Sequence, residues 1–540
     1  MATTTGRMGF HFMPPTGWLN DPNGLCAFRG TIHVFHQYSP DWPASAAPRG
    51  WGHFYSDDLV HWRHQGMVIA PDTPDDASGA YSGSALVVPG AATDGGDALH
   101  LYYTGNVKEP GEYDYVHEGR RANQILVTSD DGFTFSPKRV LLRNADYPSW
   151  CTRHVRDPKV WEQDGALWMV LGARTQDDEG VVLLYGSTDG VTWTYRGVLR
   201  PSAPFGFMWE CPDRIALDGH EYLAVSPQGM QVYPWSHGLR DQAGYFALGA
   251  RRVIDAAGAT GAAGTTGAVN RVDVASPAGA SRVACATGAA GAIGPVNPDD
   301  AASSVGAPGA EHAEGVAHMV EGGELVVHEG TFRLWDEGFD FYAPQTFVDG
   351  TGRTLLIAWM GMPEAPYLSM PGGMSWEHCL TVPRVLARCA DGSIAQLPAP
   401  ELDELHGERV ALELPGSLTL PEHRADVCIE GIEGRFDLAF DGALQLSFCP
   451  GELRLAFVGE AAGRDGVGAG RTVRSVLLER LEDVRVLIDD TAVEVFVNGG
   501  AHAFATRWFP VDSQLTIAAT GRCAQAAVWP MGDGMRDTYR

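Results

Sequence analysis

A turn motif that recurs in the N-terminal half of the chain limits the possible folds more than any other feature of the sequence. Each copy has a Ser/Asp turn followed by an aromatic residue, and each follows a run typical of a β-strand. The three copies are Ser56–Trp62, Ser129–Phe135 and Ser187–Trp193. Repeats at intervals of roughly 60–70 residues suit the blades of a β-propeller. Any one copy could be an ordinary β-turn, but the joint recurrence of the Asp and aromatic positions favours the propeller.

The whole chain is predicted to be all-β. Long helical patterns are scarce, whereas Trp, Tyr, Phe, Val and Gly recur in short bursts typical of strands. Because 540 residues are too many for one hydrophobic core, we expect two domains. The first is a β-propeller at residues 1–390. The second is a β-sandwich at 400–540, where alternation such as Val484, Val486 and Ile488 is typical of hairpins.

Residues 255–318 interrupt the strand pattern. They are nearly all small or polar and include no aromatic residue and no leucine. Such a stretch cannot bury enough apolar surface to offset the entropy lost on ordering. We therefore expect a low-complexity, disordered insertion within the first domain.

Charge and cysteine content exclude several classes of partner. Lys and Arg number 39 and Asp and Glu 67, which gives a net charge of −28. A surface this acidic repels phosphate backbones and anionic lipids, so neither nucleic acid nor membrane is an expected partner. The nine cysteines are widely spaced without a Cys-x-x-Cys pair, which indicates neither a disulfide framework nor a zinc site. Because no signal peptide or membrane-spanning run is visible either, we expect a cytoplasmic protein.

Three carboxylates lie in distinctive local contexts. Asp21 lies within Trp18–Gly24, Asp157 lies between Arg156 and Pro158, and Glu210 lies between Trp209 and Cys211. Proline follows both aspartates, so we expect an extended and stiff backbone at each of them. A firmly held carboxylate is what nucleophilic catalysis requires. One such acid could be a turn or surface residue, but three of them, each beside Trp or Arg, favour an active site.

These motifs resemble glycoside hydrolase family 32, which includes invertases, bacterial sucrose-6-phosphate hydrolases, inulinases and levanases. The boxes at residues 18–24, 156–158 and 210–212 carry the resemblance. Supporting matches lie at 33–38, 51–53, 81–85, 340–347 and 493–500. The resemblance implies a five-bladed β-propeller followed by a C-terminal β-sandwich, with the active site in the central funnel of the propeller.

The resemblance also implies a function and a role for each site residue. The expected enzyme is a retaining β-fructofuranosidase that releases fructose from sucrose, sucrose 6-phosphate or short fructo-oligosaccharides. Asp21 would be the nucleophile, Glu210 the acid/base and Asp157 a stabiliser of the transition state. Asn20, Gln37, Ser82 and Arg156 would bind the fructosyl unit. Trp51 would form a wall of the site, although plain core packing is the alternative. No cofactor or metal is expected, and the only expected partner is a small sugar.

Two positions depart from the family pattern. Ala46 stands where a tryptophan that contacts substrate is usual, and Trp42 could replace it; Tyr81 stands where Phe is commoner. The choice among sucrose, its 6-phosphate and oligosaccharides stays open, because a phosphate needs a basic pocket and no phosphate loop is recognisable. Two other functions also stay open. An inactive sugar-binding propeller would have lost its carboxylates, and a fructosyltransferase would differ only in its acceptor site. A metal-dependent hydrolase is disfavoured because no cluster of ligands is visible.

Overall fold

The computed structural model describes residues 7–45, 47–250, 324–363, 365–368 and 375–539. Within these ranges strands form nearly all of the regular structure, which confirms the all-β prediction. The described helices are short 3₁₀ turns: η1 (Asn144–Asp146), η2 (Pro234–Ser236), η4 (Glu329–Thr331), η5 (Pro400–Leu405) and η6 (Gly459–Ala462). Ala46 and the predicted insertion at 255–318 lie outside the described residues.

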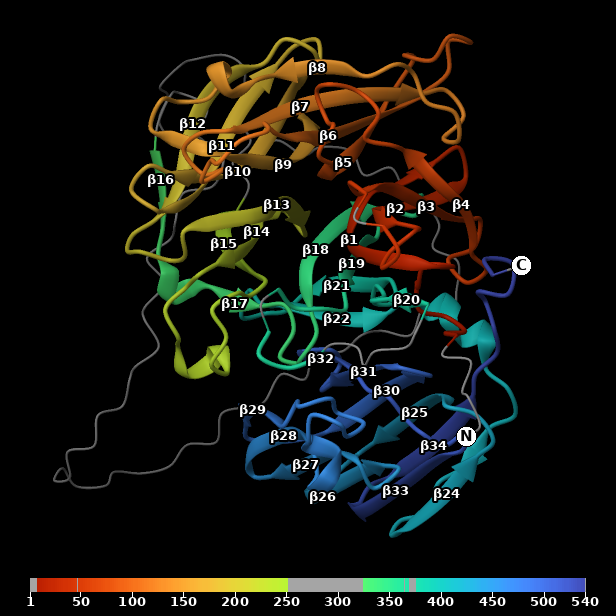
Figure 1. The fold of residues 1–540 in the computed structure, drawn as a ribbon. Coiled ribbons are helices and arrows are strands. Elements are labelled where there is room, and N and C mark those ends of the chain that lie inside the picture. The colour runs from red at the N-terminus through yellow and green to blue at the C-terminus, as the bar shows by residue number, and fades with distance from the viewer. Residues whose placement is uncertain (1–6, 46, 251–323, 364, 369–374, 540) are drawn as a thin grey trace, which may run out of the picture.

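In the described part of residues 17–398 the strands form five small sheets, and Figure 1 shows them above the two sheets of the C-terminal part. In hydrogen-bonded order, the first is β20 (Trp376–Glu377), β1 (Gly17–Phe28), β2 (Thr31–Ser39), β3 (Gly50–Ser56) and β4 (Arg63–Ile69); the second is β5 (Ala80–Val88), β6 (Ala98–Lys108), β7 (Arg120–Ser129) and β8 (Arg139–Leu142). The third is β16 (Glu324–Val327), β12 (Thr194–Pro201), β11 (Gly180–Ser187), β10 (Ala166–Thr175) and β9 (Cys151–Gln163). The fourth is β13 (Met208–Leu217), β14 (His220–Gln228), β15 (Gly244–Ala250) and β17 (Arg333–Leu334), and the fifth is β18 (Tyr342–Val348), β19 (Thr354–Trp359), β21 (Arg384–Arg388) and β22 (Ile394–Pro398).

The first strands of the five sheets form a closed ring. Strand β1 contacts β5, β5 contacts β9, β9 contacts β13, β13 contacts β18, and β18 contacts β1. Backbone hydrogen bonds also close the ring. Strand β20 lies between β19 and β21 of the fifth sheet in the chain, but it pairs in parallel with β1 of the first. Side chains from the inner ends of all five sheets can therefore converge on one axis.

The recurring turn found in the sequence occupies the same place in the first three sheets. It joins β3 to β4, β7 to β8 and β11 to β12. In the first copy, Asp58 Oδ1 accepts hydrogen bonds from the backbone N–H groups of Val60 and His61. Asp131 and Asp189 make the equivalent pairs of bonds. The repeat is thus one turn structure used three times, as its sequence predicted.

Two six-stranded sheets form the C-terminal part (Figure 1). One contains β23 (Val410–Ala411), β34 (Gln525–Pro530), β25 (Arg424–Glu430), β30 (Asp483–Asp489), β31 (Ala492–Val497) and β32 (His502–Arg507). The other contains β24 (Gly416–Leu420), β33 (Leu515–Arg522), β26 (Glu433–Phe440), β27 (Leu444–Cys449), β28 (Gly451–Phe457) and β29 (Val473–Leu478). Both contribute to a single apolar core that includes Val484, Val486 and Ile488. The predicted hairpin is β30–β31. The boundary expected at residue 390 falls between β21 and β22, which pair with each other, so the fifth sheet continues to Pro398.

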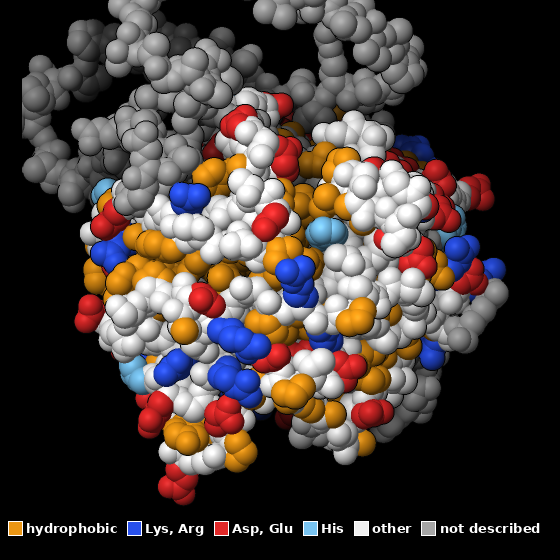
Figure 2. Space-filling model, turned by 90° about the horizontal axis from the view of Figure 1, so that it is seen from above, with side chains coloured by type: hydrophobic (Ala, Val, Ile, Leu, Met, Phe, Trp, Pro, Cys, Tyr) orange, Lys and Arg blue, Asp and Glu red, His pale blue; other side chains and the backbone are white. Residues whose placement is uncertain are grey.

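The excess of negative charge is not gathered into one block on the face shown in Figure 2, where acidic and basic side chains are interspersed. Among the described residues, no helix is long and apolar enough to cross a membrane.

Candidate active site

The first strand of each of the five sheets, in chain order, carries a bulge at the same point. Two of its residues oppose one residue of the neighbouring strand: residues 20–21, 81–82, 157–158, 211–212 and 343–344. A bulge changes the direction in which the local side chains point. The ring therefore presents five irregular segments, and four of them contain a predicted site residue or its direct neighbour.

The backbone at Asp157 differs from the extended conformation predicted from the following proline. Its φ is 63°, and Cys211 and Ala343, at equivalent positions, have φ values of 46° and 48°. All three precede a proline, so the bulge overrides the usual preference of that position. Asp21 lies in strand β1 without a positive φ among the described backbone exceptions.

Seven of the eight predicted site residues line one cavity of about 570 Å³. They are Asn20, Asp21, Gln37, Ser82, Arg156, Asp157 and Glu210. Trp51 does not line it. The Trp51 side chain is fully buried, its ring lies 5.8 Å from that of Tyr103, and its Nε1 donates to the carbonyl of Tyr81 at 3.0 Å. The structure therefore places Trp51 in the core behind the cavity wall, which is the alternative that core packing offered.

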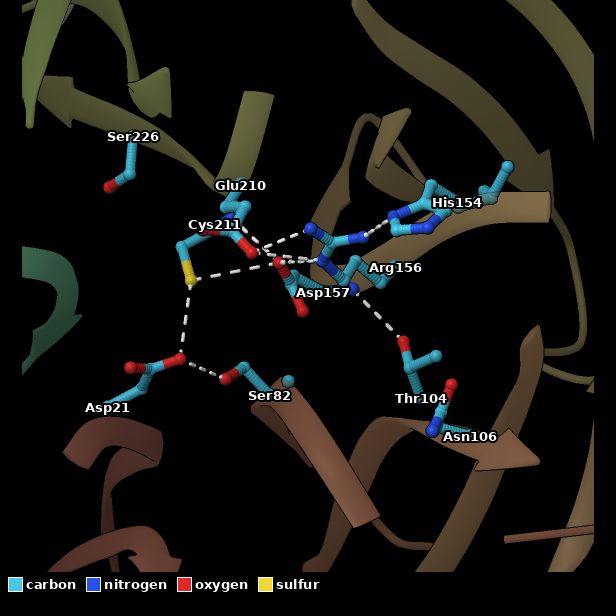
Figure 3. Close-up of polar contacts among 12 residues, drawn as sticks. Asp21, Ser82, Thr104, Asn106, His154, Arg156, Asp157, Glu210, Cys211 and Ser226 are labelled. Atoms are coloured by element: carbon cyan, nitrogen blue, oxygen red, sulfur yellow. Dashed lines mark hydrogen bonds and ion pairs between the residues drawn. The ribbon is translucent and has the colours of Figure 1, made fainter. Parts of the chain in front are cut away.

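Asp21 is held by two short hydrogen bonds (Figure 3). Ser82 Oγ donates to Asp21 Oδ2 at 2.6 Å, and Asn20 Nδ2 donates to Oδ1 at 2.9 Å. Asn20 is itself fixed, because Trp18 Nε1 donates to its side-chain oxygen at 2.8 Å. Burial raises the pKa of Asp21, while the bonds from Ser82 and Asn20 favour its ionised form. The result is a carboxylate with a fixed direction and few other contacts.

Glu210 is bound by residues from the two neighbouring sheets. Arg156 Nη2 donates to Glu210 Oε1 at 2.6 Å, and Tyr342 Oη donates to Oε2 at 2.9 Å. Arg156 also lies 3.8 Å from Asp157 Oδ2. These contacts join the third, fourth and fifth sheets around one carboxyl group, and Figure 3 shows the contact between Arg156 and Glu210.

Asp157 and Cys211 connect the remaining parts of the site. The Cys211 N–H donates to Asp157 Oδ2 at 3.0 Å, and the Asp157 N–H donates to Thr104 Oγ1 at 3.0 Å. Cys211 Sγ lies 3.7 Å from Asp157 Oδ2 and 3.9 Å from Asp21 Oδ2 (Figure 3). Burial raises the pKa of Asp157 against the effect of Arg156, and burial also holds the pKa of the Cys211 thiol well above its ordinary value. Cys211 is therefore a neutral thiol that can donate weakly to either aspartate.

Several residues of the cavity wall were not predicted from the sequence. The most polar of these are Arg49, Arg120 and His154. Trp42 and Tyr81, which the sequence had singled out as departures from the family pattern, also line the cavity. Arg49 lies in the loop before β3, and Arg120 is the first residue of β7. A lone arginine in a loop or at a strand end carries no motif. The one available signal was the adjacent pair Arg120-Arg121.

The only group of His and carboxylate side chains in the described ranges with metal-ligand geometry lies far along the chain, in Asp403, His406 and Asp426. Arg485 Nη2 already pairs with Asp403 at 2.5 Å and with Asp426 at 2.6 Å. The Arg485 guanidinium already supplies the positive charge that a metal ion would bring, so Asp403, His406 and Asp426 belong to an ion-pair network.

Comparison with known proteins agrees with the motifs. Residues 11–265 and 309–398 match the family model described as the glycosyl hydrolases family 32 N-terminal domain, and residues 462–530 match the corresponding C-terminal model. Sucrose-6-phosphate hydrolase of Bacillus subtilis (strain 168) is 32% identical, across 97% of this chain and 94% of that protein. Raffinose invertase of Escherichia coli is 30% identical, across 94% of this chain and 91% of that protein.

A solved structure of sucrose-6-phosphate hydrolase from Lactobacillus gasseri superposes with a TM-score of 0.75 at 22% identity, covering 99% of this chain and 94% of that one. The Bombyx mori β-fructofuranosidase of family 32 superposes with a TM-score of 0.71 at 23% identity, covering 98% and 95%. These likenesses show a shared fold, the combination of a β-propeller with a β-sandwich. With family matches over both parts of the sequence, the chain belongs to glycosyl hydrolase family 32.

Proposed function

We propose that this protein is a retaining β-fructofuranosidase that hydrolyses the glycosidic bond of sucrose, sucrose 6-phosphate or short fructo-oligosaccharides and releases fructose. The observation that carries the proposal is the convergence of Asp21, Asp157 and Glu210, from three separate motifs, on one cavity. The names of the relatives, sucrose-6-phosphate hydrolase and raffinose invertase, support the same substrate class.

The fold gives this proposal its scaffold. The five sheets would be the blades of a five-bladed propeller, with the cavity in its central funnel. The closed ring of first strands and the bulge shared by all five support that number. The catalytic domain would span residues 1–390 and the sandwich 400–540, apart from the short continuation of the fifth sheet to Pro398.

In the first chemical step, Asp21 attacks the anomeric carbon of the fructosyl unit. Ser82 and Asn20 orient the two oxygens of Asp21, so the attacking lone pair has a fixed direction before substrate binds. Glu210 donates its proton to the departing oxygen, and the bond between fructose and the leaving sugar breaks. Arg156 and Tyr342 donate hydrogen bonds to the two oxygens of Glu210 and stabilise the negative charge that the step leaves on them.

In the second step, Glu210 removes a proton from water, which attacks the fructosyl–Asp21 ester from the face that the leaving sugar vacated. Two inversions at the anomeric carbon give net retention. Asp157 would bind the fructosyl hydroxyls and stabilise the positive charge that develops in both transition states. Gln37, which is fixed by a hydrogen bond to the Ala80 carbonyl at 2.9 Å, would bind the same unit.

Beyond the fructosyl unit, we propose that Trp42 takes the place of the usual family tryptophan. Trp42 lines the cavity, and its ring lies edge-on to that of Trp18 with centroids 5.5 Å apart. A cytoplasmic location is also proposed. It is supported by Cys26, Cys151, Cys211 and Cys379, which are buried thiols instead of disulfides.

Transfer to methanol tests the reaction class and its stereochemistry together. Sucrose in buffer with methanol should yield fructose and methyl β-fructofuranoside, whose configuration is stable and can be read by NMR. Formation of the α-anomer would overturn retention, and a complete lack of sucrose and sucrose 6-phosphate cleavage would overturn the proposed function. A product spectrum dominated by oligosaccharides at low sucrose concentration would favour a fructosyltransferase instead.

A further inference from the structure

Two cations in the cavity wall have no part in the proposed transfer of the fructosyl unit. Arg49 and Arg120 both line the cavity, and neither forms an ion pair with a carboxylate of the described residues. Arg156, the third arginine of the wall, is already engaged by Glu210. Asp21 and Glu377 act on Arg49 electrostatically without forming an ion pair with it, so both guanidinium groups can still contact an anionic ligand.

Both arginines are held so that donors remain for a ligand. The Arg49 guanidinium lies over the ring of Trp18, 4.7 Å from its centroid, and no described residue accepts a hydrogen bond from it. Arg120 donates from Nε to the Tyr115 carbonyl at 2.9 Å and from Nη1 to Asn106 Oδ1 at 2.8 Å. Two of its five N–H groups are thus used by neutral acceptors that fix its orientation.

Tyr81 also lines the cavity and interacts with both of these cations. Its hydroxyl hydrogen-bonds with Arg120, and it interacts electrostatically with Arg49 as well. The sequence had marked Tyr81 as a departure from the commoner phenylalanine. The departure therefore adds one hydroxyl group beside Arg120 in the cavity wall.

The electrostatic character of this wall can be read from His154. Arg156 Nη1 donates to His154 Nδ1 at 2.8 Å, and His154 Nε2 faces the Tyr115 carbonyl at 3.1 Å, so the ring is neutral with its proton on Nε2. Burial, with Arg156, Arg120 and Arg174 nearby, lowers the pKa of His154 to about 2. A histidine that cannot accept a proton here marks a region of positive potential beside Glu210.

We propose that Arg49, Arg120 and the Tyr81 hydroxyl bind the phosphate of a substrate whose leaving sugar is phosphorylated, so that sucrose 6-phosphate is preferred to sucrose. This inference rests on the proposed function. Glu210 protonates the leaving oxygen, so the leaving sugar lies on its side of the cavity, where Arg120 and Arg156 also lie. Arginine matches the tetrahedral oxygens of a phosphate, and two such groups with a hydroxyl suit a dianion. Without the two arginines, the three carboxylates of the cavity would repel the phosphate dianion.

The first test is the ratio of kcat/KM for sucrose 6-phosphate to kcat/KM for sucrose. It is measured in the wild type, in Arg120→Gln, in Arg49→Gln and in the double variant. The ratio should fall roughly ten- to hundredfold for each arginine, the range expected for a charge-assisted hydrogen bond. Arg120→Lys should recover part of the loss, because it restores the charge without the guanidinium geometry. Tyr81→Phe should lower the ratio by less than either arginine variant does.

Arg121→Gln is the matched control. Arg121 follows Arg120 directly, and its replacement by glutamine removes the same charge. Arg121 does not line the cavity, however, and its Nε pairs with Glu109 at 2.7 Å. Its ratio should equal that of the wild type. If Arg121→Gln lowered the ratio as much as Arg120→Gln, the effect would come from net charge, and the proposed contact would be wrong.

Inhibition separates a sugar-phosphate site from a general anion site. Glucose 6-phosphate should inhibit sucrose hydrolysis competitively and much more strongly than glucose or inorganic phosphate does, and Arg120→Gln should abolish the difference. Equal inhibition by inorganic phosphate and glucose 6-phosphate would overturn the proposal. Equal turnover of the two substrates, with a ratio that no variant changes, would do so as well. Failure to cleave either substrate would instead overturn the proposed function itself.

Discussion

The guanidinium of Arg156 donates two hydrogen bonds to the same oxygen of Glu210, from Nη2 at 2.6 Å and from Nε at 3.1 Å. Arg156 belongs to β9 and Glu210 to β13, so the contact spans two neighbouring sheets of the ring. Oε2 accepts from Tyr342 on β18. The direction of the Glu210 carboxyl is therefore set by residues that come together only when the ring has closed.

The proposed nucleophile gives the simplest prediction. Asp21→Asn should keep the fold, because an amide has the same shape and Asn20 and Ser82 can still contact it. Turnover should fall by a factor on the order of 10⁴ or more, since an amide cannot form the fructosyl ester. Steady-state hydrolysis of sucrose and of its 6-phosphate measures the loss. Asp57→Asn, on an exposed turn of the same sheet, is the control, and near-wild-type activity of Asp21→Asn would refute the mechanism.

The core of the site could be predicted from the sequence because its residues lie in dense local motifs. Asp21, Asp157 and Glu210 each have neighbours within a few positions that restrict the backbone, and those neighbours are visible in one dimension. Arg49 and Arg120 were missed for the opposite reason. Their environment is made by Trp18, Tyr81 and Tyr115, which approach only in the fold.

Two local predictions failed because a tertiary constraint outweighed a local one. Trp51 was expected at the cavity wall because of its motif, but the motif does not say on which face of β3 its side chain lies. Trp51 pairs with Gln37 across β2 and β3 and so shares the face of a cavity residue, but its ring is buried against Tyr103 of the neighbouring sheet, a contact that only the fold creates. At Asp157, the proline rule favoured an extended backbone, but closing the bulge between Arg156 and Lys159 requires a left-handed residue.

A cluster of buried neutral histidines in the first sheet should make the protein sensitive to acid. His36 Nδ1 donates to the Gln37 carbonyl at 3.0 Å, so its Nε2 must accept a hydrogen bond from His64 Nε2, 3.0 Å away. Burial lowers the pKa of His33 to about 4, that of His53 to about 3 and that of His64 to about 4. A proton on either member of a facing pair would place two donors against each other.

The sign of the effect follows from these lowered pKa values. Above about pH 6.5 the histidines are neutral in both the folded and the unfolded chain, and they cost no stability. As the pH falls from about 6.5 toward 4, the unfolded chain binds protons that the folded chain does not, so the free energy of unfolding decreases. Urea unfolding between pH 7 and pH 4.5 should show a loss on the order of several kcal/mol from the cluster. His64→Gln should flatten this dependence, whereas a substitution of the exposed His117 should leave it unchanged.

The two parts of the molecule should unfold together because a buried ion network joins them. Oε2 of Glu494, on β31, accepts from Arg384 Nε of β21 at 2.7 Å. Oε1 of Glu494 accepts from the Val382 N–H at 2.8 Å and lies 2.9 Å from His11 Nε2. Glu494→Ala would leave the Arg384 guanidinium buried without this partner. The expected cost is ~3–5 kcal/mol of unfolding free energy, seen as one cooperative transition at a lower temperature.

Glu433→Ala is the control for that network. Glu433 is exposed and lies 3.9 Å from the equally exposed Arg522, so its loss should change stability little. If calorimetry of Glu494→Ala instead resolved two transitions, of which only one had shifted, the network would not couple the two parts.

The last prediction concerns Glu210 and distinguishes an acid/base from a residue that only binds sugar. Glu210→Ala removes the proton donor for the leaving oxygen and the base for the second step, so the loss should depend on the leaving group. Release of glucose from sucrose needs protonation and should slow by a factor on the order of 10²–10⁴. A β-fructoside with an acidic phenol as leaving group barely needs it, so fructosylation of Asp21 should proceed and the ester should accumulate. Azide, which needs no base, should then release it as the β-configured fructosyl azide. Equal slowing of both substrates, without any effect of azide, would show that Glu210 is not the acid/base.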